Sequence, residues 1–209
     1  MSAASLDPRI QAIRASIHGA GADRDQRGAD LDEHAPGDAE SAGLQAAVSL
    51  VLRAGDQLDF LLVKRATHER DPWSGQMALP GGRWELDDDG LLYTAQRETR
   101  EETGVDLVSV GTPIGRLNDV TTASPRIPKL RIAAFAFAVP RETEATVASP
   151  ELDSVHWVPI DLLRAPETAS EVKIDYPGHR RRFPSYNVVG EHVWGLTHRI
   201  LSGFLDLYE

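Results

Sequence analysis

Apolar residues recur along most of the chain, and their spacing changes from one stretch to the next. Between residues 6 and 17 they follow helical spacing, as at Ile10, Ile13 and Ile17, which predicts a short amphipathic helix. Residues 18–42 hold almost no large apolar side chains and many Gly, Ala, Asp and Glu. Such a segment cannot bury enough surface to offset the entropy of ordering, so we expect a flexible loop. A functional lid is the alternative.

Four later stretches give clear signals of strand or helix. Residues 44–52 and 58–63 are apolar runs separated by a polar turn, which predicts a β-hairpin. Residues 91–103 show helical periodicity, and Gly104 follows as a usual helix stop. Residues 129–139 are apolar on both faces, so we expect a central strand.

The remaining periodic stretches complete the predicted fold. We expect strands at residues 106–117 and 155–158, a second hairpin from 172–176 and 182–188, and a closing helix over 192–208. Strands interleaved with a few helices, without strict alternation, fit an α+β fold with a mixed sheet between helices. We divide the chain into an N-terminal helix and flexible loop (residues 1–43) and one domain (residues 44–209).

Composition and charge narrow the classes of function. The chain has 209 residues, no cysteine and a formal net charge of −10. Disulfides and thiolate metal sites are excluded, and the acidic surface argues against non-specific nucleic-acid binding. A small phosphorylated substrate held through a metal remains compatible with this charge. No apolar run is long enough to span a membrane and no secretory signal is visible, so we expect a cytoplasmic protein without membrane contact.

The strongest chemical signal is a group of three glutamates, Glu98, Glu101 and Glu102, in the predicted helix. They fall on one helical face, where like charges one turn apart cost roughly 0.2–0.5 kcal/mol per pair. Hard oxygen ligands of this kind suit magnesium, manganese or calcium. A solvated acidic face is the alternative. The Gly-Gly turn at residues 81–82 favours the metal site, because glycine lets the backbone approach an ion. An EF-hand loop starting at Glu85 fails, because its twelfth position is a glutamine.

This segment resembles the signature of the Nudix hydrolases: G, five residues, E, seven residues, then R-E-(aliphatic)-x-E-E-x-G-(aliphatic). The positions that match are Gly82, Arg97, Glu98, Glu101, Glu102, Gly104 and Val105. One extra residue lies between Gly82 and Arg97, and Asp89 stands at the distance from Arg97 at which the signature has its first glutamate. The resemblance covers about residues 44–209 and implies an α/β/α sandwich. It also implies hydrolysis of a nucleoside diphosphate linked to another group.

The resemblance also implies roles for individual residues. Glu98, Glu101 and Glu102 are the expected metal ligands, with the Gly82 carbonyl as a further one, for Mg²⁺ or alternatively Mn²⁺. Arg97 is expected to orient a neighbouring carboxylate.

A carboxylate on a later loop is expected to complete the metal shell or to act as the base. Glu151 is the first candidate and Asp153 the second. A solvated loop acid is the alternative reading of Glu151.

A second stretch resembles the additional signature of coenzyme A pyrophosphatases. It comprises residues 61–66, Arg70, Gly75 and residues 79–82, and the last helix is also similar to that subfamily. Arg65 and Arg70 are therefore candidates for binding substrate phosphates, with surface charge as the alternative.

Aromatic and glycine residues supply the other candidates for substrate binding. Trp73 could stack on a base or pack in a loop, and Gly81 and Gly82 would lie beside the ligand. The other tryptophans, Trp84, Trp157 and Trp194, are expected to pack. The three arginines at 180–182 are expected to decorate an exposed hairpin, and binding of an additional phosphate is the alternative.

The sequence thus predicts a metal-dependent hydrolase of coenzyme A or a related dinucleotide. Within the same class, a nucleoside diphosphate sugar or a nucleoside triphosphate is the alternative substrate. A nucleotide-sensing module is a different class, against which the intact glutamates argue, and a calcium-buffering acidic protein is a third. Many members of the family are dimers, and the sequence leaves a homodimer open.

Overall fold

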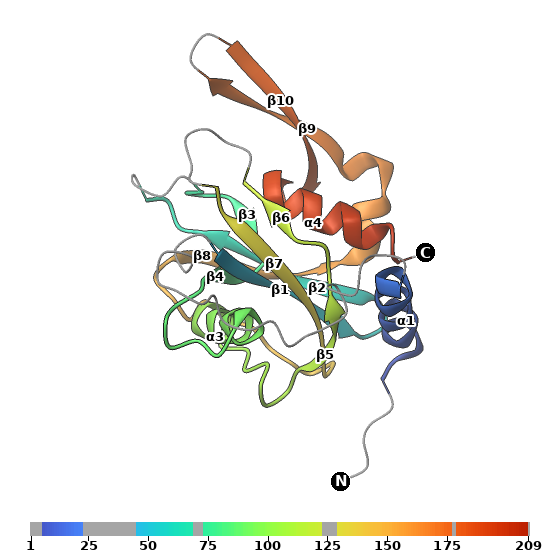
Figure 1. Ribbon diagram of the computed structural model, residues 1–209. Helices are drawn as coiled ribbons and strands as arrows, with labels where there is room; N and C mark the ends of the chain where they lie inside the picture. Colours follow the sequence, from blue (N-terminus) through green and yellow to red (C-terminus); the bar gives the residue numbers. More distant parts are fainter. Residues whose placement is uncertain (1–5, 23–44, 69–72, 123–128, 177–178, 209) are drawn as a thin grey trace.

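The computed structural model describes residues 6–22, 45–68, 73–122, 129–176 and 179–208 (Figure 1). Its helices, in chain order, are α1 (Pro8–Ala22), α3 (Leu91–Thr103), the short 3₁₀ helices η1 (Ile160–Arg164) and η2 (Pro166–Thr168), and α4 (Gly195–Leu205). Its strands are β1 (Gln45–Ala54), β2 (Leu58–Arg65), β3 (Met77–Ala78), β4 (Gly81–Arg83), β5 (Thr112–Arg116), β6 (Val120–Thr121), β7 (Arg131–Val139), β8 (Leu152–Pro159), β9 (Ala169–Tyr176), β10 (His179–Val188) and β11 (Glu191–Trp194).

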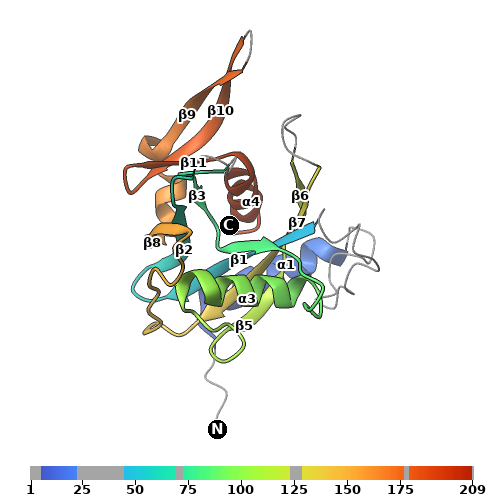
Figure 2. The same ribbon diagram turned by 90° about the vertical axis from the view of Figure 1, so that its left-hand side faces the viewer.

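The main sheet is mixed, as predicted. Its central path runs β3-β2-β1-β7-β5, in which β1 is parallel to β7 and antiparallel to β2. Strand β8 pairs with β2, while the short strands β4 and β6 pair with β1 and β7. A second sheet, β11-β10-β9, is antiparallel, and its β9–β10 hairpin projects away from the main sheet (Figure 2).

Two apolar cores lie on opposite faces of the main sheet, because side chains alternate along each strand. On β7, Phe135 and Phe137 pack in the core beneath α3, whereas Ile132 and Ala134 belong to the core shared with α1 and α4. Figures 1 and 2 both place α3 on one side of the sheet and α4 on the other, and Figure 1 shows α1 on the side away from α3. This is an α+β arrangement with helices on both faces.

The predicted hairpin at residues 44–63, the helix at 91–103, the central strand at 129–139 and the second hairpin are confirmed. The predicted N-terminal helix is also present and continues to Ala22. The rest of the predicted 18–42 loop lies outside the described residues. No helix in the described part of the chain combines the length and apolar character that crossing a membrane requires.

The predicted N-terminal helix ends at residue 17 and the observed one at Ala22, and two further predicted boundaries are wrong. The strand expected over 106–117 is limited to Thr112–Arg116, because the Asp106 carboxylate accepts hydrogen bonds from the Val108 N–H and the Ser109 hydroxyl and holds a turn there. The closing helix begins at Gly195 rather than at residue 192, since Glu191–Trp194 pairs with β10 as strand β11. In both places pairing or local side-chain hydrogen bonds override the apolar periodicity.

Candidate active site

Helix α3 is fixed to the main sheet by buried hydroxyl groups. The Thr99 hydroxyl lies 2.8 Å from the Ser49 hydroxyl of β1 and 2.7 Å from the Ala95 carbonyl, to which Ser49 also donates at 3.0 Å. The helix ends at Gly104, whose φ of 72° is a left-handed conformation that favours glycine. These contacts set the rotation of α3 and turn the face with Glu98, Glu101 and Glu102 toward β4.

Arg97 is the centre of an ion-pair network at the start of this face. Its Nε and Nη2 donate to the two carboxylate oxygens of Asp88 at 2.7 and 2.9 Å. Its Nη1 donates to Glu98 at 3.0 Å and to Glu101 at 3.2 Å. Hydrogen bonding to Asp88 raises the pKa of Arg97, so this guanidinium stays charged. The orienting role that the Nudix resemblance implies for Arg97 therefore has a geometric basis.

Asp88, and not Asp89, is the acidic partner of Arg97. Asp88 is 4% exposed, and it also accepts hydrogen bonds from the Glu85 N–H at 3.0 Å and the Thr94 hydroxyl at 2.8 Å. Burial alone would raise the pKa of Asp88, but the hydrogen bonds from Arg97, Glu85 and Thr94 outweigh it and lower that pKa. Asp89 is exposed. Counting six residues forward from Gly82 reaches Asp88, so the sequence did contain a signal for it.

The two glycines before the helix lie in strand β4 rather than in a free turn. Gly81 and Gly82 pair with Val48 and Ala47 of β1, and Gly81 has a φ of 152°. A side chain at Gly81 would lie 2.2 Å from the Ala47 carbonyl oxygen. At Gly82 a Cβ would lie 2.3 Å from a carboxylate oxygen of Glu98. Glycine is therefore required at Gly81 for the close pairing with β1, and at Gly82 so that the acidic helix can approach the backbone of β4.

Two of the three glutamates are withdrawn from solvent. The Glu102 side chain is 6% exposed and accepts a hydrogen bond from the Gly81 N–H at 3.0 Å. Burial raises the pKa of Glu102 to about 7, although the Gly81 N–H lowers it, and the nearby charge of Glu98 raises it further. Burial also raises the pKa of Glu98, and Arg97 partly opposes this. The third, Glu101, is 57% exposed. Negative charge is thus concentrated at this site without full compensation.

Glu151 faces the same acidic group, and Asp153 does not. The negative charge of Glu151 contributes to the raised pKa of Glu102, and Glu151 lines the same cleft. Its carbonyl accepts a hydrogen bond from the Ala66 N–H at 2.7 Å, which holds the loop beside the end of β2. Asp153 instead lies near Lys64, whose pKa it helps to raise. The geometry favours Glu151 over Asp153 as the later carboxylate.

The predicted substrate-binding residues lie in one cleft where the structure describes them. Arg65 is 4.0 Å from the Glu102 carboxylate, and Trp73 also lines the cleft while packing against the apolar core. Arg70 lies outside the described residues.

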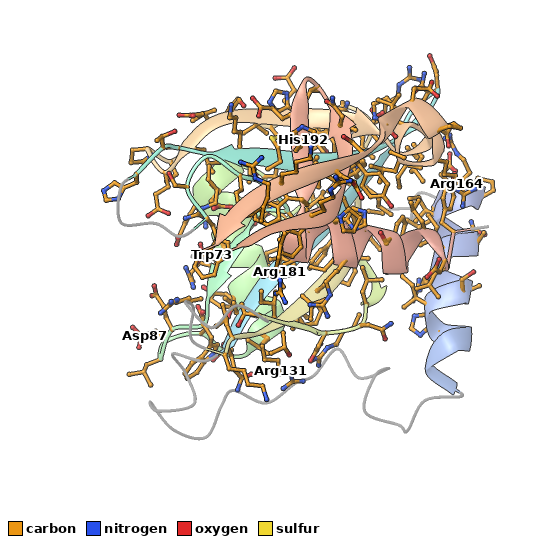
Figure 3. All side chains as sticks on the ribbon, turned by 90° about the horizontal axis from the view of Figure 1, so that it is seen from above. Trp73, Asp87, Arg131, Arg164, Arg181 and His192 are labelled. Carbon is orange, nitrogen blue, oxygen red and sulfur yellow. The ribbon has the colours of Figure 1, made fainter. Side chains whose placement is uncertain are left out.

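The cleft has a volume of about 950 Å³, which is in the range of sites for small molecules and cofactors. One part of its lining is the acidic group with Arg65. The other part comes from β10, β11 and α4, and includes Phe183 and Trp194 (their rings 5.6 Å apart) and Arg181. Trp194, expected only to pack, therefore also faces the cleft. Figure 3 labels Trp73 and Arg181, whose side chains lie over the same region in that view.

The donor atoms at this site suit a hard divalent cation, since they are carboxylate and backbone carbonyl oxygens. In the described residues, however, no three acidic or histidine side chains are placed to ligate one ion together. Glu98 and Glu101 both accept hydrogen bonds from the Nη1 of Arg97, whereas Glu102 accepts one from the Gly81 N–H. The oxygen atoms of these residues are therefore suitable ligands for a divalent metal. To ligate it, at least the exposed Glu101 would have to exchange its hydrogen bond with Arg97 for the metal ion.

Comparison with known proteins agrees with this geometry. The NUDIX domain family matches residues 43–176. An uncharacterized protein of Schizosaccharomyces pombe is 36% identical over 118 residues, which are 55% of this chain and 36% of that protein. This chain thus matches only about a third of the length of the yeast protein. An uncharacterized Nudix hydrolase of Yersinia pestis is 26% identical over 157 residues, 75% of this chain and 76% of that protein.

Among solved structures, a MutT/nudix family protein from Enterococcus faecalis is 16% identical, with a TM-score of 0.49, over 99% of this chain and 75% of that chain. The family match covers most of the chain. Nudix hydrolases generally use divalent metals such as Mg²⁺. The chain belongs to the NUDIX domain family.

Proposed function

We propose that this chain is a magnesium-dependent hydrolase that cleaves the pyrophosphate bond of coenzyme A or a related dinucleotide. The observation that carries the proposal is the meeting of three features in one cleft: the carboxylates of α3, the close backbone of Gly82 and the guanidinium of Arg65. An acidic group would repel a diphosphate by itself. A divalent cation bound there would neutralise phosphate charge and lower the pKa of bound water.

The chain's own residues have distinct tasks in this proposal. Glu98, Glu101 and Glu102 would hold the cation, with the Gly82 carbonyl as a further ligand. Arg97, locked to Asp88, keeps Glu98 and Glu101 on the cleft side of the helix.

Glu151 is the proposed base, because it faces Glu102 and lies on a loop held by Ala66. The oxygen of water attacks one phosphorus of the pyrophosphate, and the bond from that phosphorus to the bridging oxygen breaks. Glu151 accepts the proton of the water, and two phosphate monoesters are released.

The lining of the cleft supports a coenzyme A-type substrate over a nucleoside diphosphate sugar. Away from the acidic group the lining is mainly apolar and aromatic, with Leu79, Leu196 and Ile200 beside Phe183 and Trp194. A sugar presents hydroxyl groups that lose their hydrogen bonds against such a surface. A long arm with few polar groups and a stacking base suits it better.

A substrate screen tests the proposal directly. Coenzyme A, NADH, ADP-ribose, UDP-sugars and nucleoside triphosphates would each be incubated with the protein and Mg²⁺, and products identified by mass. We expect coenzyme A to give adenosine 3′,5′-bisphosphate and phosphopantetheine. Cleavage of triphosphates alone would remove the coenzyme A assignment, and turnover of no compound would favour a sensor.

A matched pair of variants tests the site. E101Q removes one exposed carboxylate from the cleft, whereas E142Q removes an exposed carboxylate outside it. We expect E101Q to lose Mg²⁺-dependent hydrolysis with an unchanged unfolding temperature, and E142Q to behave like the wild type. Normal turnover by E101Q would contradict the assignment.

A further inference from the structure

The hairpin β9–β10 carries three consecutive arginines, and strand geometry separates them. Successive side chains on a strand point to opposite faces, so Arg181 shares a face with Phe183, while Arg180 and Arg182 share the other. Arg181 pairs across the hairpin with Ile174, and Ile174, Arg181 and Phe183 all line the cleft. All three arginines are exposed, but Arg180 and Arg182 are not part of the cleft lining. The structure thus selects one arginine of the three.

The side chains around Arg181 are suited to a nucleoside. Phe183 lies two residues further along the same face, and its ring packs 5.6 Å from the ring of Trp194. Such an aromatic pair offers a surface on which a base can stack, and a guanidinium beside it matches phosphate geometry through paired hydrogen bonds. Arg182, in contrast, lies 3.4 Å from Glu171 on the opposite face of the hairpin.

Arg181 also lies on a different element from the residues that would handle the scissile bond. The acidic group and Arg65 come from α3, β4 and β2, whereas Arg181 comes from β10. In a protein with a net charge of −10, a polyanionic substrate is repelled overall. A positive charge in the cleft but outside the acidic group would offset this repulsion for a substrate with a second anionic centre.

We propose that Arg181 binds a phosphate group on the nucleoside end of the substrate, away from the pyrophosphate. The inference deepens the proposed function and rests on it. Arg181 makes the site selective for nucleoside diphosphate derivatives that carry an additional phosphate, over otherwise identical compounds without it.

Coenzyme A and dephospho-coenzyme A test this, because they differ only in the 3′-phosphate. Their affinities would be measured by titration calorimetry in EDTA, so that no turnover occurs. We expect the wild type to bind coenzyme A at least about tenfold more tightly, the size of one charge-assisted contact. R181Q should bind both compounds equally. R180Q and R182Q remove the same charge from the other face of the hairpin and should keep the preference.

Three results would overturn the inference: equal or undetectable binding of the two compounds by the wild type, a preference retained in R181Q, or an equal loss in R180Q and R182Q. The last result would mean that only the total charge of the hairpin matters. Hydrolysis separates this failure from that of the proposed function. If both compounds were cleaved with Mg²⁺ at equal rates and bound with equal affinities, the role of Arg181 would be refuted and the proposed hydrolase function would stand. A phosphate-dependent affinity without cleavage would refute the hydrolase and leave the role of Arg181 standing.

Discussion

Replacing Asp88 by asparagine tests the ion-pair network that holds the acidic face of α3. Asp88 is 4% exposed, and its two oxygens accept four hydrogen bonds, from Arg97 Nε and Nη2, the Glu85 N–H and the Thr94 hydroxyl. Asparagine has nearly the same shape but no charge. Whichever oxygen becomes the amide nitrogen then faces a donor of Arg97, so at least one buried donor loses its acceptor.

The burial of Asp88 determines how much the D88N variant should lose in free energy of unfolding. Removing one partner of a buried ion pair typically costs about 3–5 kcal/mol. Arg97 keeps Glu98 and Glu101, so we expect a value near the lower end, about 3 kcal/mol. In a chain of this length 1 kcal/mol lowers the unfolding temperature by roughly 2–4 °C, which gives a decrease of about 6–12 °C. Activity should fall as well, because Arg97 would no longer be held in one orientation.

The neighbouring Asp89 supplies the control. It is exposed, so D89N should change the free energy of unfolding by less than about 0.5 kcal/mol. Both variants would be compared with the wild type by urea and thermal unfolding, followed through tryptophan fluorescence, and by Mg²⁺-dependent hydrolysis. A stable D88N variant together with a destabilised D89N variant would refute the reasoning and restore Asp89 to the position of the signature glutamate.

Two further predictions concern the acidic group itself. G82A places a Cβ 2.3 Å from a Glu98 oxygen and should displace that carboxylate, so we expect about a 100-fold loss of hydrolysis. G203A is the control and should retain activity, because nothing lies within 4 Å of its Cβ. Equal activities of the two variants would contradict the close contact between Gly82 and Glu98. The raised pKa of Glu102 means that its neutral form is favoured on folding. This stabilisation is complete below the unfolded value near 4.5 and is lost as pH rises through about 7. In EDTA the free energy of unfolding should therefore fall between pH 5 and pH 8.5, by an amount on the order of 3 kcal/mol, and E102Q should flatten this dependence on pH. A wild-type free energy of unfolding that does not change over this pH range would contradict the prediction.

The sequence predicts best where one signal is enough. The helix over 91–103 has apolar periodicity and a glycine stop, and its bounds agree with those of α3. The contact between the acidic helix and the two glycines follows from their motif, and the Gly81–Glu102 hydrogen bond places them together. β11 shows the limit. Residues 191–194 fit the helical periodicity of the segment that follows, and they become a strand because β10 offers its unpaired edge.

The sequence fails where the direction of a side chain decides. Counting back from Arg97 selects Asp89, and counting forward from Gly82 selects Asp88. Because this chain has one extra residue between Gly82 and Arg97, each aspartate satisfies the signature spacing from one end only. The fold shows which of the two carboxylates is buried against Arg97. The same holds for the arginine run at 180–182, in which three identical residues differ only in the face of β10 that they occupy.

The burial of the acidic group argues against a merely solvated helix face. A solvated face would leave its carboxylates exposed, with ordinary pKa values, because water would stabilise their charges. Here Glu102 is buried and its pKa is about 7, and the pKa of Glu98 is raised by burial as well. Glutamine at these positions would remove the repulsion while keeping the shape. The buried glutamates therefore lower the stability of the metal-free protein and concentrate negative charge at one point of the cleft. Cation binding requires such a concentration of charge.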